Sequence, residues 1–442
     1  MRALIFVAVF LLCPPASAEE ATVIYKGASL IDGTGAPMKK DIAIITKGER
    51  IVAISPSADV SPAQAAGAQI VDTRGLYELP GLINSHVHLA SPPDRNYALA
   101  LLRRDVYSGV TTVRDMAGDT RFLGDLSRAA KLGEIVSPDI YYAALMAGPE
   151  FFHDPRTAEA ARGETPGQTP WMRAVTEQTN LPIAIAEAHG TGATAIKIYA
   201  DLPARFVQGI TAEAHRQHML VWAHAAVFPA NPHEVIDAGA DVVSHVCMLA
   251  YQASAQMPRA YHNRAPVEAD KFSGANPTVQ ALFEDMKQRG TILDATVYAY
   301  DAMWKVPNPT SKPYCSLALA EKLAGEAHRA GVLISTGTDA PADWKSPYSS
   351  LNDELELLVH NAGFTSLEAI EACSRVGAMT GGRAKDIGTI EPGKIADIVF
   401  IAKNPLENIT NLRSVVMTVK RGKLYRRSDY APVTKDEVGD NQ

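Results

Sequence analysis

The amino-acid sequence predicts an α/β fold: a (β/α)₈ TIM barrel with a small β-sandwich domain built from both chain ends. Three observations lead to this prediction. Between residues 81 and 380, eight short apolar runs alternate with helical stretches, and eight is the number of strands that such a barrel needs. On both sides of this region, β-branched runs are separated by Gly and Pro turns. Histidines, a lysine and an aspartate recur where the predicted barrel strands end.

Residues 1–18 have the features of a secretory signal peptide. Arg2 precedes an apolar run over residues 3–12, and Ala16-Ser17-Ala18 forms a small-x-small cleavage site. The apolar run is too short to span a bilayer, and the bulky Leu12 before Cys13 disfavours a lipoprotein. We therefore expect a periplasmic or secreted protein with no membrane contact after cleavage.

Composition limits the class of partner. The net charge of −7 is mild for 442 residues, and no basic stripe with interleaved aromatic residues is present, which argues against nucleic acid. A small-molecule substrate is expected, and a homo-oligomer is left open. After signal cleavage the three scattered cysteines, Cys247, Cys315 and Cys373, predict no disulfide framework.

The two ends of the chain predict one β-domain. Its N-terminal part, residues 19–80, reads as an antiparallel unit with strands over residues 22–25, 42–45, 51–54 and 70–72. Its C-terminal part, residues 381–430, has β-texture over residues 388–393, 397–401 and 415–419, and residues 431–442 form a tail. Termini that lie close together would let both parts pair into one small sandwich.

The barrel, residues 81–380, is predicted from its alternating pattern. Helices are expected over residues 211–218 and 316–330, and a long helical region over residues 351–378. Apart from the strand that carries His86, the expected strands cover residues 109–113, 140–143, 195–199, 220–224, 241–245, 291–294 and 332–336.

His86 and His88 lie one residue apart at the end of an apolar run. In a strand, residues i and i+2 point to the same face, so both imidazoles project together. Neutral imidazole is the commonest metal ligand among side chains. The alternative is a pair of hydrogen-bonded histidines near a loop.

Four further residues, Lys197, His224, His245 and Asp339, fall at the carboxyl ends of other predicted strands, where the active sites of such barrels lie. Each has an ordinary alternative. A lone histidine can be a hydrogen-bonded helper, Lys197 can extend outward to solvent, and Asp339 can cap the next helix. One shared site explains all of them better than independent coincidence on separate strands.

The residue types fit a centre with two divalent metal ions, with zinc expected. His86 and His88 would supply two ligands to one ion, and His224 and His245 two to the other. Two ions can share a hydroxide that attacks the scissile group. A bridging ligand needs an anionic oxygen, which Lys197 gains if its neutral amine adds CO2 to form a carbamate. Burial in a barrel interior lowers the pKa of a lysine in the direction that this requires.

These motifs resemble the amidohydrolase superfamily, in its imidazolonepropionase-like and Xaa-Pro-dipeptidase-like branch. The matching segments cover almost the whole chain after residue 18: residues 80–88 (PGLINSHVH), 109–115 (GVTTVRD), 196–199 (IKIY), 223–225 (AHA), 244–245 (SH), 337–340 (GTDA), 388–397 and 404–406 (NPL). The resemblance implies that His86, His88 and Asp339 bind one metal ion, that His224 and His245 bind the other, and that carboxylated Lys197 bridges them. It also implies that Asp339 is the general base that passes a proton to the leaving amine.

The sequence departs from the dipeptidases around the substrate. The loop after His224 lacks their Gly- or Arg-bearing pattern, and Ser244 precedes His245 where they carry Glu, which puts their carboxylate contacts in doubt. Phe151, Phe152, Tyr300 and the three candidate substrate-binding residues His153, Tyr298 and Trp304 are expected in strand-end loops, with ordinary loop packing as the alternative.

Tyr199 lies two residues after Lys197 and is expected on the same face of its strand. Its hydroxyl is a candidate catalytic group toward the substrate carbonyl or oxyanion, and a hydrogen-bonded core tyrosine is the alternative. Arg114 and Asp115, which follow the second strand, are expected to pair with each other.

The sequence therefore predicts an exported binuclear metal-dependent hydrolase of amide bonds, with dipeptides or N-acyl amino acids as substrates. Hydrolysis of cyclic amides, lactones or phosphotriesters at the same site is the alternative within enzymes. A metal-free, non-catalytic scaffold is the alternative of another class, and the complete set of ligand positions argues against it.

Overall fold

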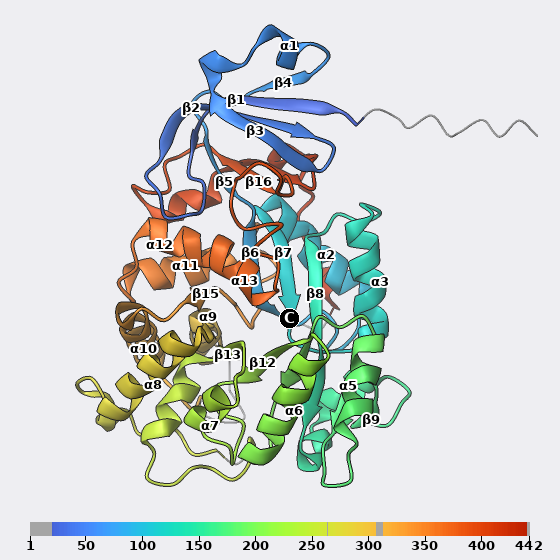
Figure 1. The fold of residues 1–442 in the computed structure, drawn as a ribbon, viewed down its shortest axis with the longest axis vertical. Helices are drawn as coiled ribbons and strands as arrows, with labels where there is room; N and C mark the ends of the chain where they lie inside the picture. Colours follow the sequence, from blue (N-terminus) through green and yellow to red (C-terminus); the bar gives the residue numbers. More distant parts are fainter. Residues whose placement is uncertain (1–19, 263, 306–312, 440–442) are drawn as a thin grey trace, which may run out of the picture.

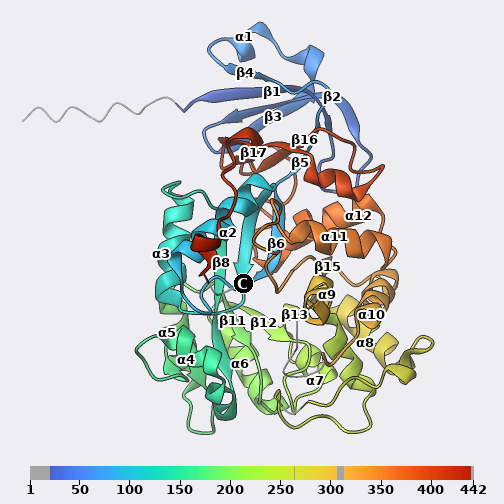
Figure 2. The ribbon, with the colours of Figure 1, turned by 180° about the vertical axis from the view of Figure 1, so that it is seen from behind.

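The computed structural model describes residues 20–262, 264–305 and 313–439. A barrel with surrounding helices forms the larger part of the molecule, and a mixed β-sheet lies against one end of it (Figures 1 and 2). This arrangement confirms the predicted fold class. The predicted signal peptide lies outside the described residues.

Eight parallel strands form the barrel. They pair in chain order, and Ser85 N on the first strand donates to Thr336 O beyond the last at 2.9 Å, which brings the two ends of the sheet together. The strands are β6 (Leu82–Val87), β7 (Val110–Asp115), β8 (Asp139–Ala147), β11 (Ala195–Ile198), β12 (Leu220–His224), β13 (Val242–Ser244), β14 (Ile292–Asp294) and β15 (Ile334–Ser335). Two short strands, β9 (Gln168–Thr169) and β10 (Met172–Ala174), extend the sheet beside β8.

Helices cover the outside of the barrel (Figure 1). Most of them begin at a side-chain cap, as α10 does at Ser316, whose hydroxyl accepts from Leu319 N. The helices around the barrel are α2 (Arg95–Tyr107), α3 (Thr120–Lys131), α4 (Pro155–Ala161), α5 (Leu181–Gly190), α6 (Ala204–Arg216), α7 (Pro232–Asp237), α8 (Pro277–Arg289), α9 (Val297–Lys305), α10 (Leu317–Ala330), α11 (Leu351–His360), α12 (Ser366–Glu371) and α13 (Gly377–Thr380).

Strand alternation decides which side chains enter the barrel. In β11, Ile196 and Ile198 belong to the large core between strands and helices, whereas Ala195 belongs to the interior cluster together with Tyr199. Lys197 shares the interior face, because successive residues of a strand point to opposite sides. The predicted common face of Lys197 and Tyr199 follows from this register.

The second domain is an eight-stranded mixed sheet with the strand order β18-β17-β16-β5-β1-β2-β3, and β4 also pairs with β1. The strands are β1 (Thr22–Leu30), β2 (Lys39–Lys47), β3 (Arg50–Pro56), β4 (Gln69–Asp72), β5 (Tyr77–Pro80), β16 (Ile398–Ile401), β17 (Val415–Lys420) and β18 (Lys423–Arg426). A four-residue helix, α1 (Pro62–Ala65), precedes β4. Pairing of β5 with β16 joins the two ends of the chain as predicted.

Two details of this sheet differ from the expectation. β4 and β5 run parallel to β1, so the N-terminal unit is not purely antiparallel. Residues 388–393 form turns and no strand. Gly388 and Gly393 both have a φ of 92°, a left-handed conformation that interrupts an extended backbone.

The segment after residue 430 folds back onto the barrel. Helix α14 (Lys435–Val438) packs on α2, where Val433 and Val438 contact Ala100. Arg103 holds this segment with two hydrogen bonds to the Glu437 carboxylate, each 2.9 Å long. The predicted tail is therefore ordered structure up to residue 439.

Cys247 and Cys315 form a disulfide, and Cys373 is free and buried. The expectation that the cysteines form no framework missed this pair, because 68 residues separate its members in the sequence. Among the helices of the described residues, none is long and apolar enough to cross a membrane.

Candidate active site

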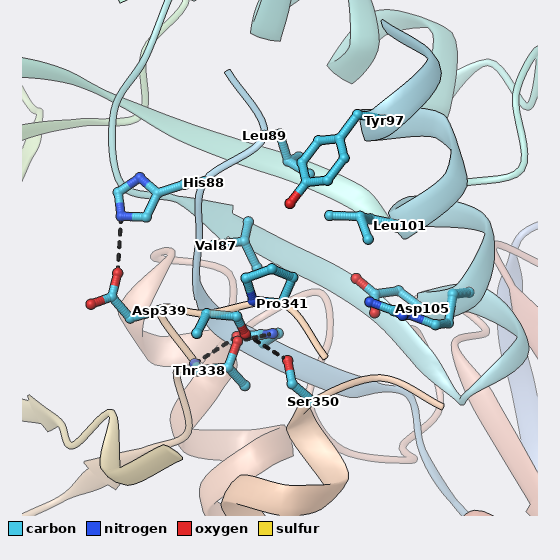
Figure 3. A pocket seen from close by; sticks show the side chains of 13 residues that line it. Val87, His88, Leu89, Tyr97, Leu101, Asp105, Thr338, Asp339, Pro341 and Ser350 are labelled. Carbon is cyan, nitrogen blue, oxygen red and sulfur yellow. Dashed lines mark hydrogen bonds and ion pairs between the residues drawn. The ribbon is translucent and has the colours of Figure 1, made fainter. Parts of the chain in front are cut away.

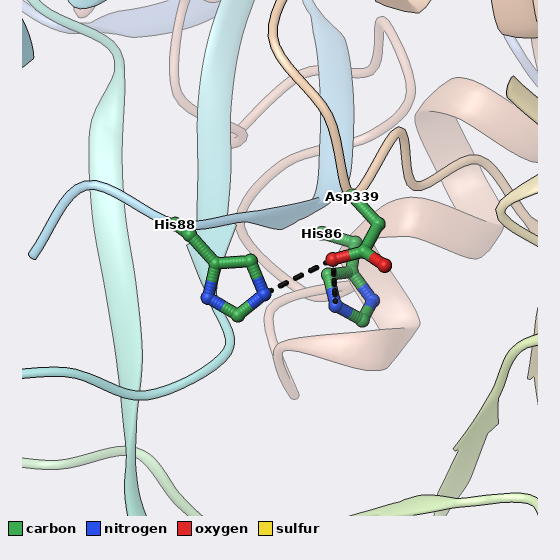
Figure 4. Close-up of side chains that lie close together, drawn as sticks. All are labelled: His86, His88 and Asp339. Atoms are coloured by element: carbon green, nitrogen blue, oxygen red, sulfur yellow. Dashed lines mark hydrogen bonds and ion pairs between the residues drawn. The ribbon is translucent and has the colours of Figure 1, made fainter. Parts of the chain in front are cut away.

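The Asp339 carboxylate joins three of the predicted ligands. Its Oδ1 atom lies 3.2 Å from His86 Nε2 and 3.0 Å from His88 Nε2, and its Oδ2 atom lies 3.7 Å from His245 Nδ1. Figure 4 shows His86 and His88 converging on this carboxylate from neighbouring positions of one chain segment. One nitrogen or oxygen from each of His86, His88 and Asp339 lies within 4.8 Å of the others, a spacing that could hold a metal ion.

The other ring nitrogen of His86 is held by Asp294. His86 Nδ1 lies 2.7 Å from Asp294 Oδ2 at the end of β14. The same oxygen accepts from Ser244 Oγ at 3.0 Å and from Arg114 Nη2 at 3.2 Å. A carboxylate on one imidazole nitrogen fixes the ring orientation and leaves the second nitrogen for a ligand.

Arg114 and Asp115 do not pair with each other, so that prediction was wrong. Successive strand residues point to opposite sides, and Arg114 therefore enters the barrel toward Asp294 and stacks over Trp222 at 4.4 Å. Asp115 instead accepts from Leu89 N at 2.6 Å and Ala117 N at 3.1 Å, which holds the segment after His88.

His224 and His245 approach the cluster from β12 and from the residue after β13. Their rings lie 4.8 Å apart, and the His245 ring lies 5.0 Å from that of His86. His245 Nδ1 also lies 3.0 Å from Thr296 Oγ1. Burial lowers the pKa of His245 to about 3 and that of His224 well below its usual range, so both imidazoles are neutral, as metal ligands must be.

Lys197 lies inside the barrel, with a fully buried side chain. Its ammonium nitrogen has no hydrogen-bond partner among the described residues, and burial lowers its pKa to about 7. The alternative in which Lys197 extends to solvent is thereby excluded. At pH 7 such an amine is neutral about half of the time, and a buried amine without a partner fits the residue that a carbamate requires.

The candidate ligand atoms therefore fit a bound metal ion, because no protein group in the part of the chain that the structure describes takes the place of such an ion beside them. Like Lys197 Nζ, His224 Nδ1 is buried without a hydrogen-bond partner among the described residues. Native structures rarely leave such groups unsatisfied. The side of the site that carries Lys197, His224 and His245 has the residue types to bind a divalent metal ion.

Three residues around the cluster have a left-handed backbone: Asp339 with φ 51°, His245 with φ 74° and Thr296 with φ 49°. Such conformations cost energy for residues with side chains and concentrate at functional sites. Asp339 precedes no helix directly, since α11 begins only at Leu351. Its role as a helix cap is therefore excluded.

Two cavities adjoin His88. The smaller, of about 50 Å³, lies between the His88–Asp339 pair and α2, with Tyr97, Leu101 and Asp105 on its far side (Figure 3). The larger, of about 170 Å³, lies between His88, Tyr199 and the segment after β8. The side chains of His88 and Asp339 are 30% and 24% exposed, so this part of the site is open to a small molecule.

Tyr199 stands at the wall of the larger cavity. Its ring packs 4.1 Å from that of His224 and 4.5 Å from that of Phe151. Tyr261, from the long segment after β13, packs against both His224 and Tyr199. The placement puts Tyr199 beside the predicted ligands.

The three candidate substrate-binding residues lie elsewhere. His153 is highly exposed and faces Glu150 at 3.5 Å. Trp304 is half exposed and donates to Cys315 O at 3.0 Å. Tyr298 lies on α9, a helix where a loop was expected, and lines neither cavity. Phe151 is the member of the predicted aromatic group that lines the larger cavity.

Sequence reasoning missed Asp294, Tyr261 and Arg156 near the site. Asp294 had a detectable signal, because it ends a predicted strand as the metal-ligand candidates do. Tyr261 and Arg156 lie in irregular segments without a repeating pattern, and their positions depend on how those segments fold over the barrel.

Known proteins resemble this chain over most of its length. A sequence profile of the amidohydrolase family matches residues 77–425. The chain is 25% identical to an ochratoxinase from Aspergillus niger, with 95% of this chain and 90% of the relative aligned. A shorter match is 40% identical to an N-acyl-D-aspartate deacylase from Alcaligenes xylosoxydans xylosoxydans, but covers only 21% of this chain and 17% of that enzyme.

Solved structures give the same picture of the fold. The crystal structure of A. niger ochratoxinase superposes with a TM-score of 0.73 at 21% identity, over 92% of this chain and 96% of that one. A Xaa-Pro dipeptidase with bound methionine superposes with a TM-score of 0.71 at 21% identity, over 92% and 100%. With the barrel, the ligand geometry and the profile match together, this chain belongs to the amidohydrolase family.

Proposed function

We propose that this protein is an exported, binuclear metal-dependent hydrolase that cleaves the amide bond of dipeptides or N-acyl amino acids. The observation that carries the proposal is the Asp339 carboxylate, whose two oxygens face His86, His88 and His245 at 3.0–3.7 Å. The names of the relatives point the same way, since they include an aminoacylase, a deacylase and a dipeptidase.

His86, His88 and Asp339 would hold one ion, His224 and His245 the other, and carboxylated Lys197 would bridge them. Two divalent ions at such a centre lower the pKa of a bound water and polarise a carbonyl. Zinc suits the imidazole and carboxylate donors.

Asp339 would act as the general base and then as the acid. Its carboxylate is partly exposed, and its pKa lies well below the usual range, because the charge of His86 and the hydrogen bonds from His86 and His88 outweigh the effect of burial. It therefore starts as an acceptor, and once it has gained a proton it can pass that proton to the departing amine. An amine is a poor leaving group that needs such protonation.

The Tyr199 hydroxyl would donate a hydrogen bond to the oxygen of the scissile carbonyl as negative charge develops there. Burial raises the pKa of Tyr199 well above its usual range, and a hydrogen bond with Tyr261 acts in the same direction, so the phenol keeps its proton. To act on the substrate, the hydroxyl would turn from Tyr261 to the carbonyl oxygen.

Export is supported by the signal-like N-terminal sequence and by the Cys247–Cys315 disulfide, since disulfides persist in oxidising compartments. Fractionation of the producing cells and N-terminal sequencing of the mature protein test this part. A cytoplasmic, uncleaved chain would contradict it.

Metal analysis and a substrate screen test the proposal. Protein made with zinc and bicarbonate should contain two divalent ions per chain, and fully active protein with one ion would contradict the binuclear centre. The screen compares dipeptides, N-acyl amino acids, lactones and phosphotriesters. Turnover of lactones or phosphotriesters without any amide cleavage would favour the alternative chemistry, and a metal-free, inactive protein would favour the scaffold.

A further inference from the structure

The larger cavity beside the site has apolar walls. Its volume of about 170 Å³ is below the ≈ 300 Å³ at which pockets begin to enclose drug-sized ligands, so it suits one amino-acid-sized group. His88 and Tyr199 lie on its lining, and the apolar part of that lining consists of Ala117, Leu145, Phe151, Ala160 and Met172.

One permanently charged side chain lines this cavity among the described residues, that of Arg156 at the start of α4. Its Nε donates to both Asp154 oxygens at 3.1 Å, and its Nη2 donates to Asp154 Oδ2 at 2.6 Å. The Asp154 carboxylate is itself buried and lies 3.4 Å from His262 Nε2. These hydrogen bonds orient the guanidinium, while the Arg156 side chain stays 56% exposed and so accessible to a ligand.

The pair with Asp154 leaves donors of Arg156 unused. A guanidinium has five N–H donors, and Nη1 makes no hydrogen bond to any residue that the structure describes. Arg156 also lies near enough to Tyr199 for its charge to counteract the rise that burial causes in the pKa of that phenol. The lining of the cavity thus combines Tyr199 and His88 with a cation that Asp154 holds and with apolar side chains.

We propose that Arg156 determines specificity by binding the free carboxylate of the substrate through Nη1, while the apolar walls hold the side chain of the same residue. This inference rests on the proposed amide hydrolysis, because it places the scissile carbonyl beside His88 and Tyr199. It narrows the substrate class to N-acyl amino acids and dipeptides whose C-terminal residue is apolar and carries a free carboxylate.

The Asp-x-Arg pair alone does not support this role. Asp72 and Arg74 make the same pair in the small domain, with Nε and Nη2 of Arg74 on the Asp72 carboxylate, and Arg74 lines none of the cavities described above. What distinguishes Arg156 is its place on the wall of a cavity that begins at the site. Arg74→Met is therefore a matched control for Arg156→Met.

The experiment compares two substrates that differ only in the carboxylate: N-acetylphenylalanine, as each enantiomer, and N-(2-phenylethyl)acetamide. The metal-loaded wild type should favour the better enantiomer of the acid by roughly 10- to 100-fold in kcat/KM, the range of a hydrogen bond to a charged group. Arg156→Met should abolish this ratio, mainly by raising KM for the acid, and should change hydrolysis of the neutral amide much less. Arg74→Met should keep the wild-type ratio.

A wild-type enzyme that hydrolyses both compounds equally, or an Arg156→Met variant that keeps the ratio, would overturn the inference and leave the proposed function standing. Thermal denaturation identifies a variant that fails to fold. In that case Arg156→Lys, which keeps the charge but loses the planar fork, replaces Arg156→Met and should lower the ratio without abolishing it.

If the wild type hydrolyses neither compound, calorimetry with 3-phenylpropanoate separates the two ideas. Binding that is weakened about tenfold or more in Arg156→Met, and unchanged in Arg74→Met, would keep the carboxylate site while the amidase proposal fails. Binding that Arg156→Met does not change would overturn the carboxylate site as well.

Discussion

The two halves of the candidate site differ in how their polar groups are satisfied. In one half, His86, His88 and Asp339 contact one another, and Asp294 holds His86 from behind. In the other half, Lys197 Nζ and His224 Nδ1 are buried without a hydrogen-bond partner among the described residues. In the first half the predicted ligands themselves contact protein groups, and the buried atom without a partner, Asp294 Oδ1, lies behind them. In the second half the atoms without a partner belong to the predicted ligands, and their burial is costly as long as they lack one.

This difference indicates what each half contributes. Side chains that are already oriented by neighbours bind a ligand without paying to become ordered. A ligand that binds to buried groups without partners gains the most free energy, because the new interactions compensate the cost of removing these groups from water. We therefore expect the Lys197 half to respond most to substitution.

Replacing Lys197 should cause the largest loss. Lys197→Ala removes the proposed bridging oxygens, which would contribute several kcal/mol to catalysis, so kcat/KM should fall roughly 10³-fold or more. Elemental analysis should show the loss of at least one metal ion per chain, and acetate or propionate should restore part of the activity.

Lys420→Ala is the matched control, since Lys420 is also buried but pairs with Asp139 at the end of the barrel where β8 begins. It should lower stability without changing the metal content. Lys197→Arg should be as inactive as Lys197→Ala, because arginine stays protonated. Wild-type turnover in Lys197→Arg would disprove the carbamate.

Asp339 belongs to both halves, because each of its oxygens faces a different set of histidines. Asp339→Asn should lower kcat for an amide about 10²- to 10⁴-fold, the contribution of a positioned acid–base group, with little change in KM. Hydrolysis of an activated aryl ester, whose aryl oxide leaves without protonation, should lose much less activity. Circular dichroism shows whether the variant is folded, and equal losses on both substrates would contradict the proton-transfer role.

The sequence predicted which residues meet at the candidate site, because these residues follow strand periodicity. His86 with His88, and Lys197 with Tyr199, share faces through the two-residue repeat of a strand. His224 ends β12, and His245 and Asp339 follow β13 and β15. Chain order and strand register were therefore enough to place the predicted ligands at one end of the barrel.

The sequence did not predict the residues whose position depends on irregular segments. His153 lies only two residues from Phe151, yet one is highly exposed while the other lines the cavity. The 3-10 turn that carries them has no alternation that the sequence could reveal. The predicted pairing of Arg114 with Asp115 was avoidable, because adjacent residues of a strand such as β7 point in opposite directions.

The Tyr199→Phe variant tests whether the second half also contains a group that acts on the substrate. Tyr199→Phe keeps the ring that packs on His224 and Phe151 but removes the hydroxyl. If that hydroxyl stabilises the oxyanion, kcat should fall roughly 10²- to 10³-fold while metal content stays the same. A variant with normal kcat would assign Tyr199 to packing alone.

The smallest effect is expected behind the first half, where Asp294 accepts hydrogen bonds from His86, Arg114 and Ser244 through one oxygen. Asp294→Asn keeps the shape but removes the charge, so His86 is oriented less firmly. Metal affinity should fall about 10- to 100-fold, as for other residues that orient a metal-binding histidine. Competition with a chelator, monitored by residual metal content, measures this affinity independently of turnover.

Ser244→Ala provides the matched variant for Asp294→Asn. It removes one neutral donor from the same Asp294 oxygen and leaves the His86 contact intact, so the change should be about fivefold, the effect of roughly 1 kcal/mol. Comparing the metal affinities of the two variants separates two effects. One is the charge of Asp294 next to His86, and the other is the hydrogen bonds that the same oxygen accepts. If Asp294→Asn changed metal affinity no more than Ser244→Ala, the Asp294 charge would not be what prepares His86, and the first half would owe its order to the direct contacts with Asp339.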